Sequence, residues 1–195
     1  MEREIKLKLD GMGEWEALRN YFGKHEERLD QVNFYFDTAG KDLEKLKAML
    51  RVRQENGKHF RMAFKRNIRI KGGYFQNEEV ETDIDSNLFA NMRLCDSLQI
   101  EELEPIRCIR RLEIVDPLLL IGKLANLRFR YFLPNGCCVE LDRITLPNGN
   151  VEYELEAETE NPGEVRAIID QIFQRLGIKV VPQTQTKYER FLSAL

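Results

Sequence analysis

The sequence predicts an α+β fold that is mainly antiparallel β, with about eight strands and few helices. The first observation is a dominant period of two, in which apolar and charged residues alternate along many short segments. The second is a set of Asn-Gly dipeptides between such segments, which are typical of β-hairpin turns. Because exposed strand edges tend to pair with other chains, so many strands favour a closed barrel or a strongly curved sheet.

The alternating segments follow one another along most of the chain. We expect strands at residues 4–9, 31–36, 50–53, 59–65, 79–81, 127–131, 139–142 and 152–158. Asn56-Gly57 lies between two of these segments, and Asn135-Gly136 and Asn148-Gly149 separate later ones. Segment 99–125 is the hardest to interpret, and we predict one strand there, around Ile106–Val115.

Helical spacing of apolar residues occurs in three places. We expect helices at residues 15–22, 88–98 and 162–176, with Ser86 as a cap before the second, and Gly23 and Gly177 after the first and third. The third is the clearest, because it begins with Pro162 and repeats apolar residues every three or four positions. We expect these helices to pack outside the sheet, in one domain that spans residues 1–195.

Composition narrows the classes of function. Lys and Arg number 30 against 33 Asp and Glu, and this balance argues against a general nucleic-acid binder. No apolar run approaches the roughly 18 residues of a membrane helix, and the charged start does not suit a signal peptide. The four cysteines form no CxxC pair, so we expect reduced thiols and a cytoplasmic protein. Only two histidines occur, which argues against a His-rich metal site.

Charged residues at alternate strand positions usually face water, and the period alone favours that interpretation. One detail argues against it. The last strand places four glutamates on one face, namely Glu152, Glu154, Glu156 and Glu158. Like charges about 7 Å apart repel one another, and a solvated surface gains nothing from them. A metal site does gain, because Mg²⁺ or Mn²⁺ takes carboxylate oxygens as ligands.

The basic residues form a second set that is rich in arginine. Arg51, Arg53 and Lys65 belong to one predicted hairpin, and Arg128 and Arg130 belong to a later strand. Guanidinium groups match phosphate oxygens bidentately. If the apolar strand faces pack outward under the helices, both charged sets line a cavity. Such buried charges need partners or ligands, and a metal-bound polyphosphate complements both signs.

Taken together, these residues resemble the CYTH domain family, also known as the triphosphate tunnel metalloenzymes. The resemblance consists of short motifs that occur in the family's order. They are the ExExK pattern at Glu2–Lys6, the YxD-type strand end at Phe34–Thr38, the LRxR-like strand Leu50–Arg53, Phe64-Lys65, the acidic segments at 79–81, 140–142 and 154–156, and Thr186-Lys187-Tyr188. Because the matches are ordered and run from residue 2 to residue 188, they are more specific than any single motif.

The resemblance implies a closed eight-stranded antiparallel barrel, a tunnel that binds triphosphate inside. By position it implies phosphate contacts from Lys6, Arg51, Arg53, Lys65 and Lys187, and from Arg128 or Arg130, or else from Arg110 or Arg111 if segment 99–125 is misplaced. It implies that Mg²⁺ or Mn²⁺ binds to Glu2, Glu4, Glu154 and Glu156, with Asp142 as a further candidate. Lys65 and Tyr35 resemble the family's acid–base pair, while Arg53 stabilises developing charge.

Three functions remain open at this point. The first is metal-dependent hydrolysis of a triphosphate: inorganic tripolyphosphate, thiamine triphosphate or a nucleotide. The second is a class IV-type adenylate cyclase, which the same family fold supports and which makes cyclic AMP and pyrophosphate. The third is a polyphosphate- or nucleotide-binding module without turnover. In each case the partner is a small-molecule triphosphate rather than a nucleic acid or a membrane, and the resemblance alone suggests a homodimer.

Overall fold

The computed structural model describes the backbone of residues 2–71, 74–93 and 101–195, and the side chains of residues 4–66, 79–92 and 101–195. Within these ranges the strands are β1 (Glu2–Leu9), β2 (Glu27–Asp37), β3 (Ala48–Glu55), β4 (His59–Lys71), β5 (Tyr74–Ile84), β6 (Leu119–Phe132), β7 (Cys138–Thr145), β8 (Val151–Glu158) and β9 (Val181–Pro182). The helices are α1 (Met12–Phe22), α2 (Asp42–Lys45), α3 (Ser86–Arg93), α4 (Glu104–Arg110), α5 (Pro162–Leu176) and α6 (Lys187–Ser193).

The strands form one antiparallel nine-stranded sheet in the order β5-β4-β3-β2-β6-β7-β8-β1-β9. The predicted closed eight-stranded barrel is therefore wrong. β5 also pairs with β1, but only with Glu2–Ile5. Further along the same strand, β9 pairs with Leu7 and Lys8. Because β9 takes this part of β1, the curved sheet does not close as a regular barrel. Its mainly antiparallel β character is as predicted.

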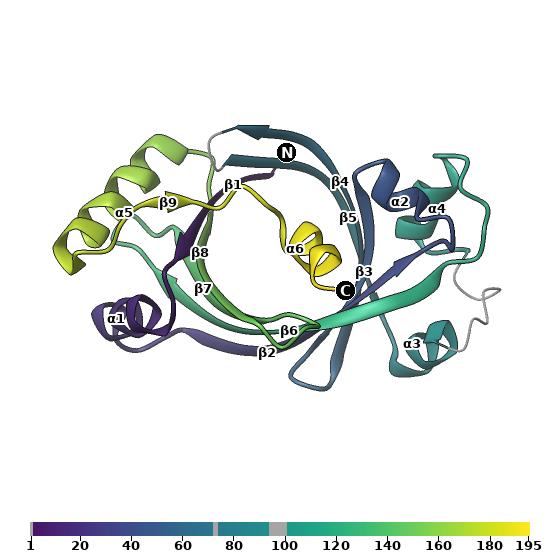
Figure 1. Ribbon diagram of the computed structural model, residues 1–195, viewed down its shortest axis with the longest axis horizontal. Coiled ribbons are helices and arrows are strands. Elements are labelled where there is room, and N and C mark those ends of the chain that lie inside the picture. The colour runs from purple at the N-terminus through teal and green to yellow at the C-terminus, as the bar shows by residue number, and fades with distance from the viewer. Residues whose placement is uncertain (1, 72–73, 94–100) are drawn as a thin grey trace.

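The helices cover the outer face of the curved sheet (Figure 1). α1 and α5 lie over β1 and β6–β8, where Trp15, Leu18, Ile169 and Phe173 join the apolar core. α2, α3 and α4 lie on the opposite side, next to β3 and β4. α6 differs from the others, because it lies within the curve of the sheet (Figure 1). The apolar strand faces are thus directed outward under helices, and the charged faces are directed inward.

Local sequence signals explain many of the element boundaries. Each Asn-Gly dipeptide connects an antiparallel pair, namely β3–β4, β6–β7 and β7–β8. α5 begins and ends at the predicted residues. Its N-cap Asn161 accepts a hydrogen bond from the Glu164 backbone, and Gly177 ends the helix with a φ of 67°.

Segment 99–125 corrects the prediction most clearly. Residues 106–115, predicted as a strand, instead contain most of α4, which begins with Pro105 in its first turn. Ile106 and Ile109 are fully buried, and their spacing of three is that of a helix face on the sheet. β6 begins only at Leu119. The predicted helix at 88–98 is α3, and its last residues, 94–98, lie outside the described part of the chain.

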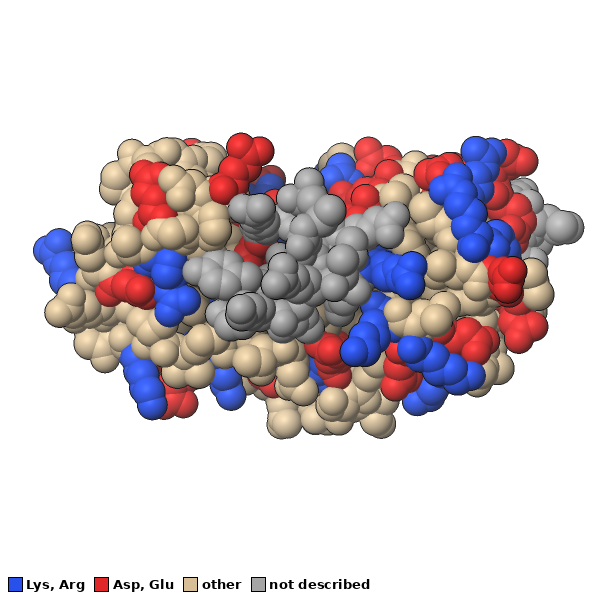
Figure 2. All heavy atoms as spheres, turned by 90° about the horizontal axis from the view of Figure 1, so that it is seen from above, with Lys and Arg blue, Asp and Glu red and all other residues tan. Residues whose placement is uncertain are grey.

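The outer surface carries both signs of charge. On the face shown in Figure 2, acidic and basic side chains are intermixed rather than gathered into one patch of a single sign. Among the described residues, no helix combines the length and the apolar character needed to span a membrane.

Candidate metal and phosphate site

A cavity of about 820 Å³ lies within the curve of the sheet. Alternation along the strands directs its charged lining inward, with contributions from β1, β3, β4, β5, β6, β7, β8 and α6. In Figure 1, β7 and β8 lie across this space from β3 and β4. The strand order therefore places the late acidic strands opposite the arginine-rich hairpin, although the two are distant in sequence.

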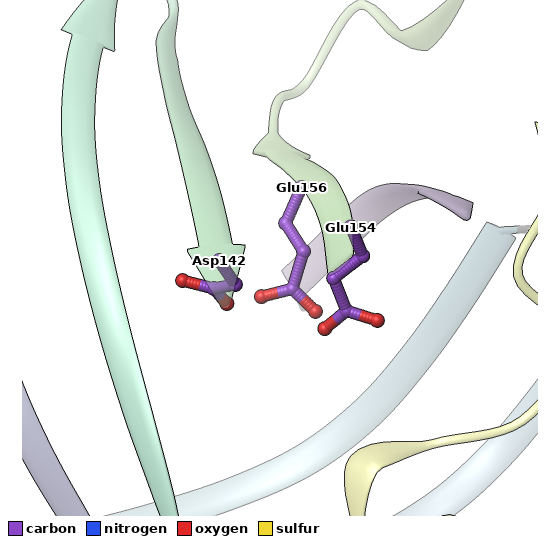
Figure 3. A group of neighbouring side chains, drawn as sticks. All are labelled: Asp142, Glu154 and Glu156. Carbon is purple, nitrogen blue, oxygen red and sulfur yellow. The ribbon is translucent and has the colours of Figure 1, made fainter. Parts of the chain in front are cut away.

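Asp142, Glu154 and Glu156 form an acidic triad on the β7–β8 side, drawn in Figure 3. One carboxylate oxygen from each lies within 4.8 Å of the others. β7 and β8 are paired so that Asp142 is directly opposite Glu154, which brings the carboxylates together. All three side chains are buried. This set of converging oxygens fits a hard divalent cation such as Mg²⁺ or Mn²⁺.

Cationic side chains surround the acidic triad. Arg128 binds Asp142 through two hydrogen bonds, of 2.8 and 2.7 Å, and also contacts Glu156 at 2.8 Å. Lys187 Nζ lies 2.8 Å from both Asp142 and Glu156 and contacts Glu154 as well. Burial by itself raises the pKa of Asp142, but Arg128 and Lys187 outweigh it and lower that pKa to about 2. Asp142 is thus held in its charged form, and Lys187, Lys6 and Arg128 likewise lower the pKa of Glu156 despite its burial.

Glu4 and Lys6 extend this acidic region onto β1. Lys6 Nζ lies 2.8 Å from Glu4 and contacts Glu156. Burial and the nearby Glu156 charge raise the pKa of Glu4 to about 7. Lys6 thus links Glu4 to Glu156 of the triad. The side chain of Glu2, the other predicted ligand from β1, lies outside the described side chains.

Arg51, Arg53 and Lys65 form the basic wall, on β3 and β4. Lys65 contacts Glu79, and Arg51 lies 3.4 Å from Glu81. The Arg51 Nε atom is buried and, among the described residues, has no hydrogen-bond acceptor. Arg53 donates to the neutral amide of Asn33 at 3.0 Å.

Within this wall, Arg53 has the least favourable electrostatic environment, because Arg51 and Lys65 both contact carboxylates. Burial lowers the pKa of Arg53 to about 10, and repulsion from Arg51 and Arg128 adds to that effect. Glu55 Oε1 lies 3.8 Å from Arg53 Nη1, so this half-buried guanidinium, crowded by two others, has a carboxylate partner only at long range. An anion bound at the basic wall would relieve both the crowding and the unpaired Arg51 Nε.

The other arginines predicted to contact phosphate lie partly along the cavity and partly on the outer surface. Arg130 is partly exposed and pairs with Glu140 and Glu27. Arg110 at the end of α4 and Arg111 directly after it lie on the outside of the sheet, where they pair with Glu101 and Glu104. The structure thus places Arg128 and Arg130, rather than the α4 arginines, along the cavity.

Tyr35 is almost fully buried beneath α6. Its ring lies 5.1 Å from that of Tyr188 and 4.6 Å from that of Phe191. Burial raises the pKa of Tyr35, although Arg51 and Arg53 act in the opposite direction. The hydroxyl is therefore neutral at physiological pH and is suited to donate a proton rather than to accept one.

Arg190 is a site residue that the sequence interpretation missed. It is 5% exposed and contacts Glu152 at 2.6 Å and Glu154 at 2.5 Å. The available signal was its position three residues after Lys187, on a helix that begins with a capping box of Thr186 and Glu189. Two basic side chains of α6, Lys187 and Arg190, therefore contact the acidic triad.

Comparison with known proteins agrees with this geometry. The CYTH domain pattern matches residues 1–191. A Hippeastrum protein, described as an adenylyl cyclase candidate with a dominant triphosphatase activity, superposes with a TM-score of 0.92 at 25% identity, over 99% of this chain and 96% of its own. An adenylate cyclase candidate from Bacillus halodurans superposes with a TM-score of 0.76 at 21% identity, over 98% and 99%.

A third solved structure, the PH1819 protein of Pyrococcus horikoshii, has a TM-score of 0.65 at 18% identity, over 98% of this chain and 99% of its own. At such identities, this structure and the Bacillus one show a common fold only. Comparison with curated proteins gave no match. Since the family pattern spans nearly the whole chain, the protein belongs to the CYTH domain family, as its motifs predict.

Proposed function

We propose that this chain hydrolyses a P–O–P bond of a small triphosphate in the cavity, with Mg²⁺ or Mn²⁺ held by Asp142, Glu154 and Glu156. The observation that carries the proposal is the opposition of two charge sets in one cavity. The acidic triad, of which Glu156 lines the cavity, offers oxygens to a cation, while Arg51, Arg53 and Lys65 line the opposite side and suit an anion. The dominant triphosphatase activity described for the Hippeastrum protein supports it.

Phosphoryl transfer depends mainly on positioning and charge stabilisation, which this cavity can provide. Arg51, Arg53 and Lys65 would bind the phosphate chain and stabilise charge that develops on the transferred group. When bound by Asp142, Glu154 and Glu156, a divalent cation would supply charge neutralisation and would acidify water. The neutral Tyr35 hydroxyl would serve with Lys65 as a proton donor to the leaving oxygen. Further predicted ligands are Glu2 and Glu4 for metal, and Lys6, Arg128, Arg130 and Lys187 for phosphate.

Adenylate cyclase activity is the second candidate, because the Hippeastrum protein is described as a cyclase candidate too. In that reaction the ribose 3′-oxygen attacks, and pyrophosphate leaves. The two activities would use the same phosphate and metal residues, so only the products separate them.

The test is a substrate panel with the metal-stripped full chain, to which Mg²⁺ or Mn²⁺ is added. Tripolyphosphate, thiamine triphosphate and ATP are supplied separately, and phosphate, pyrophosphate and cyclic AMP are measured. Release of phosphate supports hydrolysis, and cyclic AMP with pyrophosphate supports the cyclase. Binding without products, seen as a rise in melting temperature, would leave only a binding module and would overturn the proposal.

Two substitutions assign the activity to the cavity. Glu154→Gln and Arg53→Ala should each lower the rate by about 10²–10³, the size expected for loss of a preorganised charged group. Arg107→Ala is the control, because Arg107 is an exposed arginine on α4. If Arg53→Ala and Arg107→Ala have the same rate as the wild type, the active site lies elsewhere.

A further inference from the structure

Each carboxylate of the acidic triad contacts Lys187 through one oxygen and an arginine through the other. Asp142, Glu154 and Glu156 each direct one oxygen at Lys187 Nζ, namely Oδ2, Oε1 and Oε1. Their other oxygens bind arginines: Asp142 Oδ1 and Glu156 Oε2 bind Arg128, and Glu154 Oε2 binds Arg190. Two of the oxygens that face Lys187 have a second partner, since Asp142 Oδ2 also accepts from Arg128 and Glu156 Oε1 also contacts Lys6. The Lys187 ammonium therefore lies where three carboxylate oxygens converge, while the arginines hold the outer oxygens.

We infer that Lys187 occupies the cation position of the acidic triad in the metal-free protein, and that Arg190 is a positioning residue that keeps Glu154 aimed at that position. The inference rests on the proposed function only in placing the metal at this triad. Lys187 must leave the three oxygens, and Lys6 must release Glu156 Oε1, before all three can bind a metal ion, whereas Arg190 stays bound to Glu154 Oε2.

The surroundings of the two cations support these different roles. Asp142 and Glu154 are completely buried, while Lys187 lines the cavity and contacts both. A lysine has a flexible stem and a strongly hydrated ammonium, so it can leave toward the cavity without moving its helix. Arg190 has a rigid fork with two carboxylate partners, Glu152 and Glu154, and is held in place by both.

This arrangement couples the two ligands of the proposed reaction. Once Lys187 leaves the triad, its ammonium is available to an anion in the cavity. Metal and tripolyphosphate should therefore each increase the affinity of the protein for the other, by the same factor, as linkage requires. Substitution of Lys187 should weaken this coupling.

The test of Lys187 is Mn²⁺ binding by the metal-stripped full chain without substrate, measured from the loss of the electron paramagnetic resonance signal of free Mn²⁺. Lys187→Met should bind Mn²⁺ at least about tenfold more tightly than the wild type, because no tethered cation competes for the oxygens. Lys187→Gln provides a second, polar replacement. Lys47→Met is the matched control, since Lys47 is an exposed lysine of the same cavity.

Weaker or unchanged Mn²⁺ binding by both Lys187 variants would overturn the inference, and so would an equal gain in Lys47→Met. For Arg190, we expect Arg190→Met to bind Mn²⁺ about 10–100-fold more weakly, as when a residue that orients a metal ligand is lost. Arg190→Lys should recover part of that affinity, and unchanged binding by Arg190→Met would contradict the positioning role. The measurement involves no turnover, so a chain that binds Mn²⁺ as expected but hydrolyses nothing would sink the proposed function alone.

Discussion

The Tyr188 hydroxyl on α6 lies 3.5 Å from Asp37 Oδ2 at the end of β2. Asp37 is completely buried and also accepts backbone hydrogen bonds from Thr38 at 2.7 Å, Leu43 at 2.9 Å and Glu44 at 3.0 Å. One carboxylate thus caps the first turn of α2 and meets the helix that carries Lys187. The backbone contacts are short, whereas 3.5 Å is a long hydrogen bond, so the cap is the stronger part of this junction.

Replacing Asp37 should therefore affect stability more than replacing Tyr188. Asp37→Asn leaves one acceptor oxygen and turns an amide donor toward backbone donors, so we expect the free energy of unfolding to fall by about 1–3 kcal/mol. Tyr188→Phe removes only the long contact and should cost less than about 1 kcal/mol. Urea denaturation of both variants gives the comparison. Equal losses would mean that Asp37 acts mainly through Tyr188 and not as a cap.

The sequence predicted which faces of the strands are charged, because alternation fixes the side of each residue. It did not predict partners. Arg128 is predicted to contact phosphate, but nothing in the sequence indicates that its guanidinium also binds Asp142, the residue directly opposite it on β7. That contact depends on the register of β6 against β7, which pattern alone does not specify. Short apolar segments were also ambiguous: Ile106 and Ile109 fit a strand or a helix until their packing is known.

The tertiary contacts of residues near the C-terminus also could not be predicted from the sequence pattern. Thr186-Lys187-Tyr188 was identified from the family motif, but nothing local indicated that α6 lies inside the curve of the sheet. Arg190 gained its place beside Glu154 only from that tertiary arrangement. Similarly, β9 has two residues and no alternating pattern, although it decides how β1 is paired.

Gly122 gives a test of how α6 is seated. A Cβ atom built on this residue would lie 2.9 Å from Phe191 Cζ, and its φ of 152° is rare for other residues. Gly122→Ala should therefore lower the free energy of unfolding by about 1–3 kcal/mol through overpacking and backbone strain. Gly13→Ala in α1 is the matched control, because a Cβ there meets nothing within 4 Å and alanine favours helix. Denaturation curves on which the two variants coincide would exclude close seating of α6 on β6.

The pair Glu79 and Glu81 on β5 gives a prediction for pH dependence. Burial tends to raise the pKa of Glu79, but Lys65, a hydrogen bond from Glu81 and Arg51 lower it to about 2. A depressed carboxyl pKa contributes stability above its usual value of 4.5, and that contribution is lost as the pH falls toward 2. The stability difference between the wild type and Glu79→Gln should therefore shrink as the pH falls from about 5 to about 2, the window set by the two values.

Glu81 provides a control of opposite sign. Burial and its hydrogen bond to Glu79 raise the pKa of Glu81, so its ionisation costs stability as the pH rises above the usual value. Glu81→Gln should accordingly gain stability relative to the wild type toward neutral pH. Unfolding free energies of both variants across this range check the signs. If the unfolding free energies of the two variants changed with pH in the same way, the pKa values of Glu79 and Glu81 would not be shifted in opposite directions.

The basic wall leads to a prediction in which stability and binding change in opposite directions. Arg53 is crowded by Arg51 and Arg128 and donates to the neutral Asn33, while its carboxylate partner Glu55 lies 3.8 Å away. Arg53→Met removes that repulsion and places an apolar stem in a mostly buried position. We expect the ligand-free protein to melt higher, with a gain of about 1 kcal/mol, as at other functional sites that are strained for binding. The rise in melting temperature caused by metal-free tripolyphosphate should become smaller, because a phosphate contact is lost.

Arg61→Met separates this effect from simple loss of positive charge. Arg61 lies on the neighbouring strand β4 and lines the same cavity, but its hydrogen bond to Asp83 raises its pKa, so the folded protein stabilises its charge. Its replacement should leave the ligand-free protein equally or less stable and should retain most of the response to tripolyphosphate. Melting curves of the three proteins with and without tripolyphosphate, in the presence of a chelator, make the comparison. Suppose that Arg53→Met is destabilised as much as Arg61→Met and that its melting temperature still rises fully with tripolyphosphate. Arg53 would then be an ordinary structural cation, and the basic wall would not be an anion-binding site.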